Sequence, residues 1–215
     1  PAFLTILLIP SAVILGIQIQ TGEVPAFFKL HISPYKSISY ALQHSQARII
    51  SSNWNSYSKV EVVKSPSLHS IPGLSYRYLE PLPPIDGLFV DSDNLNAIFS
   101  PESEVAFADH LPASVAFHLR PEADVLILEP MGGLDLRAAL ALGANRVTAV
   151  EDNPLIIDAA RSTYAFEGIE LVKSSGRSYL RGSNQLYDII QLPLTDSYYP
   201  VSSGAYALGE DYRYT

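Results

Sequence analysis

The stretch "VLILEPMGGLDLRAALALGANRVTAVEDNP", residues Val125–Pro154, decides the fold of this chain. It begins with a short apolar strand, turns on two glycines, runs into a helix and ends on a second strand with an acidic tip. This order of elements is the layout of a nucleotide-binding crossover, in which the glycine turn faces the ligand. Glu129 and Met131 stand where such a turn usually has glycine. The stretch therefore predicts the shape of a cofactor turn and leaves open whether the turn still holds a cofactor.

The alternation of strands and helices begins at Asp124 and continues through four predicted strands. The strands are residues 124–128, 146–150, 169–173 and 187–192, and the helices are residues 134–143, 154–164 and 176–183. Short, wholly apolar strands that alternate with helices are typical of a parallel sheet buried on both faces. We predict an α/β fold: a Rossmann-like parallel sheet with helices on both faces, truncated at the C-terminus.

The N-terminal region, residues 1–32, is dominated by the uncharged run "FLTILLIPSAVILGI", Phe3–Ile17. A membrane-spanning helix needs about 20 apolar residues, so this run falls just short. The chain starts at Pro1 without Met and ends without a closing strand, so we expect it to be a fragment of a longer protein. We predict a membrane-spanning helix followed by an interfacial linker, with a signal-peptide core or a buried soluble helix as the alternatives.

The middle region, residues 33–104, is predicted to be a short helix followed by a small β-strand domain. The helix is "SPYKSISYALQHSQ", and the strands are residues 47–54, 58–65, 74–80 and 87–93. Turns rich in proline and glycine separate the strands, which favours hairpins over long central strands. Residues 105–215 then form the Rossmann-like domain, which opens with a helical pattern that Pro112 should break.

The composition excludes several classes of function. A formal charge of −8 and a pI near 5.0 argue against a nucleic-acid partner, because phosphate binding needs a surface rich in Lys and Arg. The chain has no cysteine, so it cannot form a disulfide, a thiolate zinc site or a Cys nucleophile. The five histidines are scattered, and we predict no metal site. We expect a small-molecule partner and leave a homodimer open.

Ligands of open parallel sheets bind at the carboxyl ends of the strands. Gly132 and Gly133 follow the first strand and would let a ligand approach the backbone at a helix N-terminus. Glu151 follows the second strand. Its separation from Gly133 is close to the roughly 20 residues expected between a glycine turn and an acid that binds a ribose diol. The alternative is a solvated cap of the strand. Asp196 lies near the fourth strand end, where an Asx-turn residue is the alternative to a catalytic acid.

The order of these motifs resembles the spermidine synthase-like branch of the class I S-adenosylmethionine-dependent transferases, particularly its membrane-embedded members. "SPYKSISYALQ" is similar to the segment that follows their last membrane helix, and "IPGLSYRYLEPLPPIDGLFVDSD" is similar to their β-hairpin region. Val125–Pro154 looks like their cofactor motif, while "SSGRSYLR…YDIIQL" and "SGAYALGEDYRYT" fit the later segments. The resemblance covers most of the chain from Ser33 onward.

The resemblance implies a membrane-tethered transferase, with its catalytic domain on the cytoplasmic side, that binds S-adenosylmethionine or its decarboxylated form. The transferred group would be an aminopropyl or methyl group, and the acceptor an amine or another small molecule. By position, Gly132 and Gly133 would line the methionine end, Glu151 would hold the ribose and Asp135 would support the turn. The full cofactor set carried over is Glu129, Gly132, Gly133, Asp135, Glu151, Asp152 and Ser175, and the catalytic residue is Asp196.

The sequence also departs from the family pattern. Pro193 replaces the first acid of a D-x-x-D segment, and Ser175 stands where the synthases commonly carry an Asp near the adenine. A side chain at a turn position that needs positive φ costs roughly 1 to 3 kcal/mol, which applies to Glu129 and Met131. We also expect Met131 to occupy space that the cofactor needs. Glu129 would repel the carboxylate of S-adenosylmethionine but not the decarboxylated cofactor, which lacks that group.

These departures keep two other hypotheses open. A catalytically inactive Rossmann-like scaffold or ligand sensor of the same family would explain the loss of an acid at Pro193. An NAD-dependent oxidoreductase shares the ribose acid and the glycine turn, but "EPMGGL" lacks the G-x-G-x-x-G pattern.

Overall fold

The computed structural model describes residues 10, 13–14, 16 and 32–193. The chain divides into two compact units, Pro1–Ser33 and Pro34–Thr215. In the first unit the described residues Pro10, Val13, Ile14 and Gly16 are helical. Most of the predicted membrane span, Phe3–Ile17, lies outside the described residues. Within the described part of the chain, no helix is both long and apolar enough to cross a bilayer.

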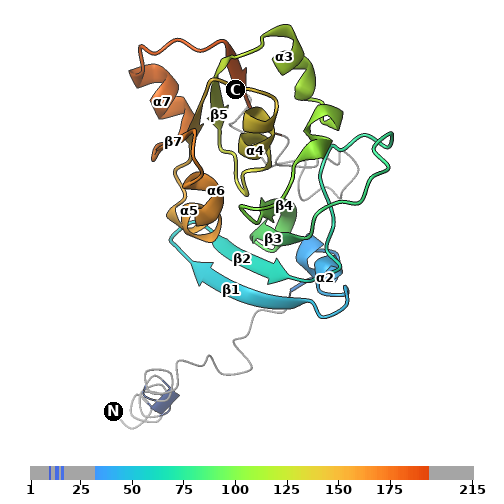
Figure 1. Ribbon diagram of the computed structural model, residues 1–215. Coiled ribbons are helices and arrows are strands. Elements are labelled where there is room, and N and C mark those ends of the chain that lie inside the picture. The colour runs from blue at the N-terminus through green and yellow to red at the C-terminus, as the bar shows by residue number, and fades with distance from the viewer. Residues whose placement is uncertain (1–9, 11–12, 15, 17–31, 194–215) are drawn as a thin grey trace. The chain divides into compact units, whose positions relative to one another are not determined.

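The second unit begins with a short helix and an antiparallel sheet (Figure 1). The elements are α2 (Ser37–Ala41), β1 (Arg48–Trp54), β2 (Lys59–Lys64), β3 (Ile85–Val90) and β4 (Asp93–Phe99). The strands lie in the order β1-β2-β3-β4, so each pairs with its neighbour in sequence. The four strands therefore form an antiparallel meander.

The predicted strand at residues 74–80 is wrong. This segment is made of turns, in which the Tyr78 amide donates to the Ser75 carbonyl at 3.0 Å, and prolines on either side limit ladder hydrogen bonds. The strand that sequence reasoning missed is β4. Its first half, "DNLN", is polar and only partly buried, so the pattern does not reveal a strand.

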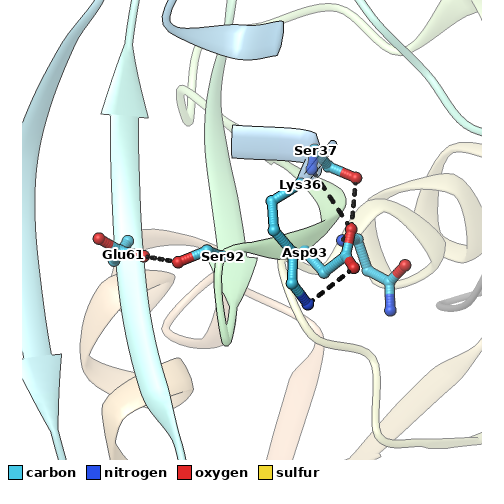
Figure 2. A network of polar contacts seen from close by, with 6 residues as sticks. Lys36, Ser37, Glu61, Ser92 and Asp93 are labelled. Carbon is cyan, nitrogen blue, oxygen red and sulfur yellow. Dashed lines mark hydrogen bonds and ion pairs between the residues drawn. The ribbon is translucent and has the colours of Figure 1, made fainter. Parts of the chain in front are cut away.

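The turn between β3 and β4 is fastened from two sides (Figure 2). Ser92 in the turn donates to Oε2 of the buried Glu61 at 2.7 Å, and Lys59 pairs with the other carboxylate oxygen at 2.6 Å. Asp93 accepts from the ammonium of Lys36 at 3.0 Å and from the hydroxyl of Ser37 at 2.7 Å, where α2 begins. Because a buried carboxylate needs partners, this network holds α2, β2 and the turn together.

The rest of the second unit alternates between helices and parallel strands. A 3₁₀ helix (Ala106–His110) and α3 (Ser114–Leu119) come first, separated at Pro112 as predicted. The sheet elements are β5 (Asp124–Leu128), α4 (Leu134–Ala141), β6 (Arg146–Val150), α5 (Pro154–Ala159), α6 (Arg161–Tyr164), β7 (Ile169–Val172), α7 (Gly176–Gly182) and β8 (Ile189–Gln191). Their strand order is β7-β6-β5-β8, and all three pairings are parallel.

Both faces of the parallel sheet are covered. On one face, Val125 and Ile127 of β5 join a core with residues of α4 and α5, such as Leu136 and Ile156. On the other face, Leu126 packs in a smaller cluster with Tyr179 of α7. The strand order, third-second-first-fourth in chain order, is that of a doubly wound nucleotide-binding half. The predicted Rossmann-like α/β fold is confirmed.

The strand order reverses between β5 and β8. The chain winds outward from β5 through β6 to β7 and then returns to the opposite side of β5. In open α/β sheets, the crevice outside the carboxyl ends of the two strands at such a switch point is where ligands bind. The candidate site is therefore expected at the ends of β5, β6 and β8.

Candidate functional site

The turn from β5 into α4 has the unusual backbone that its sequence predicts. Glu129 has φ 54°, Met131 has φ 51° and Gly133 has φ 86°, all in the left-handed region. For the two non-glycine residues this conformation costs roughly 1 to 3 kcal/mol each. The turn is held by the Glu129 amide, which donates to the Val150 carbonyl at 2.8 Å. The expected strain at Glu129 and Met131 is confirmed.

The two glycines of this turn are required by protein packing. A Cβ on Gly132 would lie 2.4 Å from the carbonyl oxygen of Ala97 in β4. A Cβ on Gly133 would lie 2.3 Å from the Thr163 methyl group in α6. Ligand approach is the expected reason for glycine at these two positions. Packing gives a second reason, because the turn lies directly against β4 and α6. The Met131 side chain is buried in the hydrophobic core.

Glu151 lies at the end of β6 and is joined to this turn. Its side chain is 2% exposed, and its Oε1 accepts from the amides of Asp152 and Asn153 at 3.1 and 3.0 Å. The Tyr164 hydroxyl donates to the Met131 carbonyl at 2.9 Å and lies 3.5 Å from Oε2 of Glu151. The structure therefore brings the glycine turn and the predicted ribose acid together through one tyrosine.

The pKa of Glu151 reports the local charge. The pKa of Glu151 is raised to about 7, mainly by burial; the negative charges of Asp152 and Glu129 add to the rise, and the amides of Asn153 and Met131 oppose it. The charges of Asp152 and Glu129 thus act on Glu151 where the ends of β5 and β6 meet. Negative charge raises the pKa of a neighbouring carboxyl group and attracts a cationic ligand.

The β1–β2 hairpin completes this region through a contact with the end of β6 that sequence reasoning missed. The Asn55 amide donates to Asn153 Oδ1 at 3.0 Å, and the Asn153 amide donates to Ser58 Oγ at 3.0 Å. These bonds fasten the β1–β2 turn onto the tip of β6. Tyr57 lies in that turn, and its pKa is raised by burial and by the charges of Asp152 and Glu151. Tyr57 is therefore a candidate to line one side of the site, next to the exposed Asp152.

Asp135 occupies the first turn of α4 and reaches the end of β8. The side-chain amide of Gln191 donates to Asp135 Oδ1 at 2.5 Å. Burial raises the pKa of Asp135 to about 6, although this bond opposes the rise. The contact spans the switch point between β5 and β8. That Asp135 supports the turn stays a prediction.

The remaining predicted residues have other positions. Ser175 is the N-cap of α7, where its Oγ accepts from the Ser178 amide at 3.4 Å. Asp196 lies outside the described residues, while Pro193 is buried. Among the residues that the structure describes, no group of three His, Cys, Asp or Glu side chains could hold a metal ion.

A groove of about 1020 Å³ lies between the antiparallel sheet and α5. Its lining includes Val60, Val62 and Ile98 of the antiparallel sheet and Leu155, Asp158 and Ala159 of α5. None of the predicted site residues within 32–193 lines it. The groove and the candidate site are therefore two separate places in the second unit.

Comparison with known proteins gives similarity to solved structures alone. No protein family model matches the chain, and no curated protein matches it. A spermidine synthase in complex with the transition state analogue AdoDATO is 20% identical, with a TM-score of 0.47 over 67% of this chain and 47% of that one. A spermidine synthase from Thermotoga maritima is 18% identical, with a TM-score of 0.47 over 70% and 48%.

Both are named for the family that the sequence motifs resemble. The matched region spans about half the length of each of these structures. Similarity at this level does not bear on which ligand this chain binds.

Proposed function

We propose that this chain is part of a spermidine synthase-like transferase that binds an adenosyl sulfonium compound at the ends of β5 and β6. The observation that carries the proposal is the contact between the glycine turn and Glu151, made by Tyr164 at 2.9 Å from Met131 O and 3.5 Å from Glu151 Oε2. In a doubly wound sheet this is the place where a glycine turn and a strand-tip acid hold a nucleoside.

The charge of the site supports the decarboxylated form of S-adenosylmethionine as the preferred ligand. Glu129 and Asp152 both act on Glu151 strongly enough to raise its pKa. The carboxylate of S-adenosylmethionine would be repelled by these groups, whereas the decarboxylated form carries only positive charge. The ribose would be held by Glu151 and Asp152, and Tyr57 would close one side.

The proposed reaction is aminopropyl transfer to a small amine. The acceptor nitrogen forms a bond to the carbon beside the sulfonium, while the carbon–sulfur bond breaks and its electron pair leaves with sulfur as neutral methylthioadenosine. The nitrogen then loses a proton to a base, for which Asp196 is the proposed group. Alignment of the amine is the protein's main contribution, and a base adds about 10²- to 10⁴-fold.

A non-catalytic ligand sensor is the second candidate, and Pro193 favours it. This buried proline takes the position of the first acid of the family's D-x-x-D segment. A chain that binds the ligand and shows no turnover of an amine would fit this alternative. Tethering to a membrane through residues 1–32, a cytoplasmic location and a homodimer remain proposals of the same account.

The binding step is tested by isothermal titration of the full chain with three compounds. We expect the decarboxylated cofactor to bind more tightly than methylthioadenosine, and methylthioadenosine more tightly than S-adenosylmethionine. The reason is that the acidic site attracts the cation and repels the carboxylate. Absence of heat and of any thermal shift with all three compounds would reject the proposal.

A second assay separates the transferase from the sensor. The full chain is incubated with the decarboxylated cofactor and putrescine, and release of methylthioadenosine is measured by chromatography. Release that depends on the amine supports transfer. Tight binding without release supports the sensor.

A further inference from the structure

The contact between Asp135 and Gln191 lies where the sheet changes direction. Asp135 belongs to the first turn of α4, directly after β5, and Gln191 is the last residue of β8. Gln191 is the register partner of Ile127, near the end of β5. Asp135 and Gln191 therefore both lie at the carboxyl edge of the sheet. This is the switch point, where a ligand can enter between diverging chain connections.

The hydrogen bonding of this pair is incomplete. Gln191 donates its amide to Asp135 at 2.5 Å, but within the described residues its buried carbonyl oxygen Oε1 has no hydrogen-bond partner. Buried polar atoms in native proteins are nearly always paired, so an orphan acceptor calls for an explanation such as a bound ion or ligand. Here the orphan oxygen belongs to the same amide group that contacts the Asp135 carboxylate, at the carboxyl end of β8.

The charge of the pair is also unbalanced. None of the ion pairs among the described residues includes Asp135. The largest influence on the pKa of Asp135 is burial, which raises it, and no positive charge from the described residues lowers it. Within residues 32–193, the Asp135 carboxylate and the Gln191 amide oxygen have no positive partner, so they offer two acceptors to one cationic donor.

We propose that Asp135 and Gln191 form an ammonium-binding subsite at the switch point between β5 and β8. The proposal rests on the function proposed above, and the ligand group is the terminal ammonium on the propyl chain of the adenosyl sulfonium compound. An ammonium has three donors and no acceptor, so it matches two neighbouring acceptors. It would neutralise Asp135 and give Gln191 Oε1 its missing partner.

This subsite would change the interpretation of Pro193. The acid that the family pattern places there is absent, while Gln191 lies two positions earlier on the same strand end. Gln191 supplies an amide oxygen from the end of β8, and Asp135 supplies a carboxylate from the first turn of α4. The subsite therefore binds the end of the propyl chain between α4 and β8. Other groups would bind the acceptor amine.

The test compares two sulfonium ligands that differ in the ammonium. The first is decarboxylated S-adenosylmethionine, and the second is S-propylated methylthioadenosine, which keeps the sulfonium and the propyl chain and has no amine. Both are titrated calorimetrically into the full chain and into Asp135→Asn, Gln191→Met and Asp158→Asn. The last is a matched control, because it makes the same acid-to-amide change at an exposed position of α5.

We expect the unmodified chain to bind the amine-bearing ligand more tightly than the amine-free one. Asp135→Asn and Gln191→Met should each weaken binding of the amine-bearing ligand, by about 10- to 100-fold for the charged partner. Their affinity for the amine-free ligand should stay within a factor of about two, which also shows that the variants fold. Asp158→Asn should leave both affinities unchanged.

Three outcomes would overturn the subsite. The unmodified chain could bind both ligands equally, the variants could weaken both ligands alike, or they could weaken neither. If the amine-free ligand binds and only the preference for the amine is missing, the function proposed above survives without the subsite. If neither ligand binds, both proposals fail together.

Discussion

Gly132→Ala is expected to destabilise the second unit by about 3 kcal/mol, with a larger loss if β4 cannot shift. The added methyl group would lie 2.4 Å from the Ala97 carbonyl oxygen and 2.9 Å from its carbonyl carbon. Both are backbone atoms of a strand paired with β3, so neither can rotate away as a side chain could. Urea unfolding followed by circular dichroism measures the free energy of unfolding.

Two other glycines provide controls for this variant. Gly182→Ala at the end of α7 meets no heavy atom within 4 Å and should change stability by less than about 0.5 kcal/mol. Gly143 has φ +81° and equally open space, so Gly143→Ala isolates the conformational penalty of about 1 to 2 kcal/mol. If Gly132→Ala were no worse than Gly182→Ala, the described contact between the turn and β4 would be incorrect.

Replacing Glu151 by Gln is expected to remove a pH dependence of stability. The pKa of Glu151 is raised from its ordinary 4.5 to about 7 by burial in the folded state. Below pH 4.5 both states are protonated and the group has little effect. As the pH rises towards 7, the unfolded chain ionises first, so stability is lost by on the order of 3 kcal/mol in all.

The measurement is the free energy of unfolding at pH 4.5 and at pH 8 for the unmodified chain and for Glu151→Gln. The difference between the two proteins should change by on the order of 3 kcal/mol over this interval, with the variant gaining at high pH. Glu170→Gln, an exposed glutamate on β7, is the matched control and should show no such change. A parallel response in all three proteins would place Glu151 in solvent.

The sequence predicted the bounds of strands and helices best where a short segment determines its own conformation. Strand β5 and strand β6 begin and end where the apolar runs predict, because each run fills a fully buried strand and is bounded by glycine or charge. Pro154 begins α5 as expected for a residue with a fixed φ and no amide hydrogen. The strain at Glu129 and Met131 followed from the same local logic.

Contacts between distant segments could not be predicted in this way. The bonds from Asn55 and Ser58 to Asn153 join residues that are nearly a hundred positions apart, and no local pattern marks them. Tyr57 entered the site only through these bonds. Gly132 illustrates the same limit. The sequence cannot distinguish a glycine required by a ligand from one required by close contact with the Ala97 carbonyl.

The central claim is that the turn at Gly132 and Gly133, together with Glu151, holds the adenosyl group. The most direct measurement is a crystal structure of the chain with methylthioadenosine. The account predicts the ribose hydroxyls within hydrogen-bond distance of Glu151 or Asp152, and the sulfur beside the turn. Electron density for the ligand in the groove between the antiparallel sheet and α5, with the ends of β5 and β6 unchanged, would contradict it.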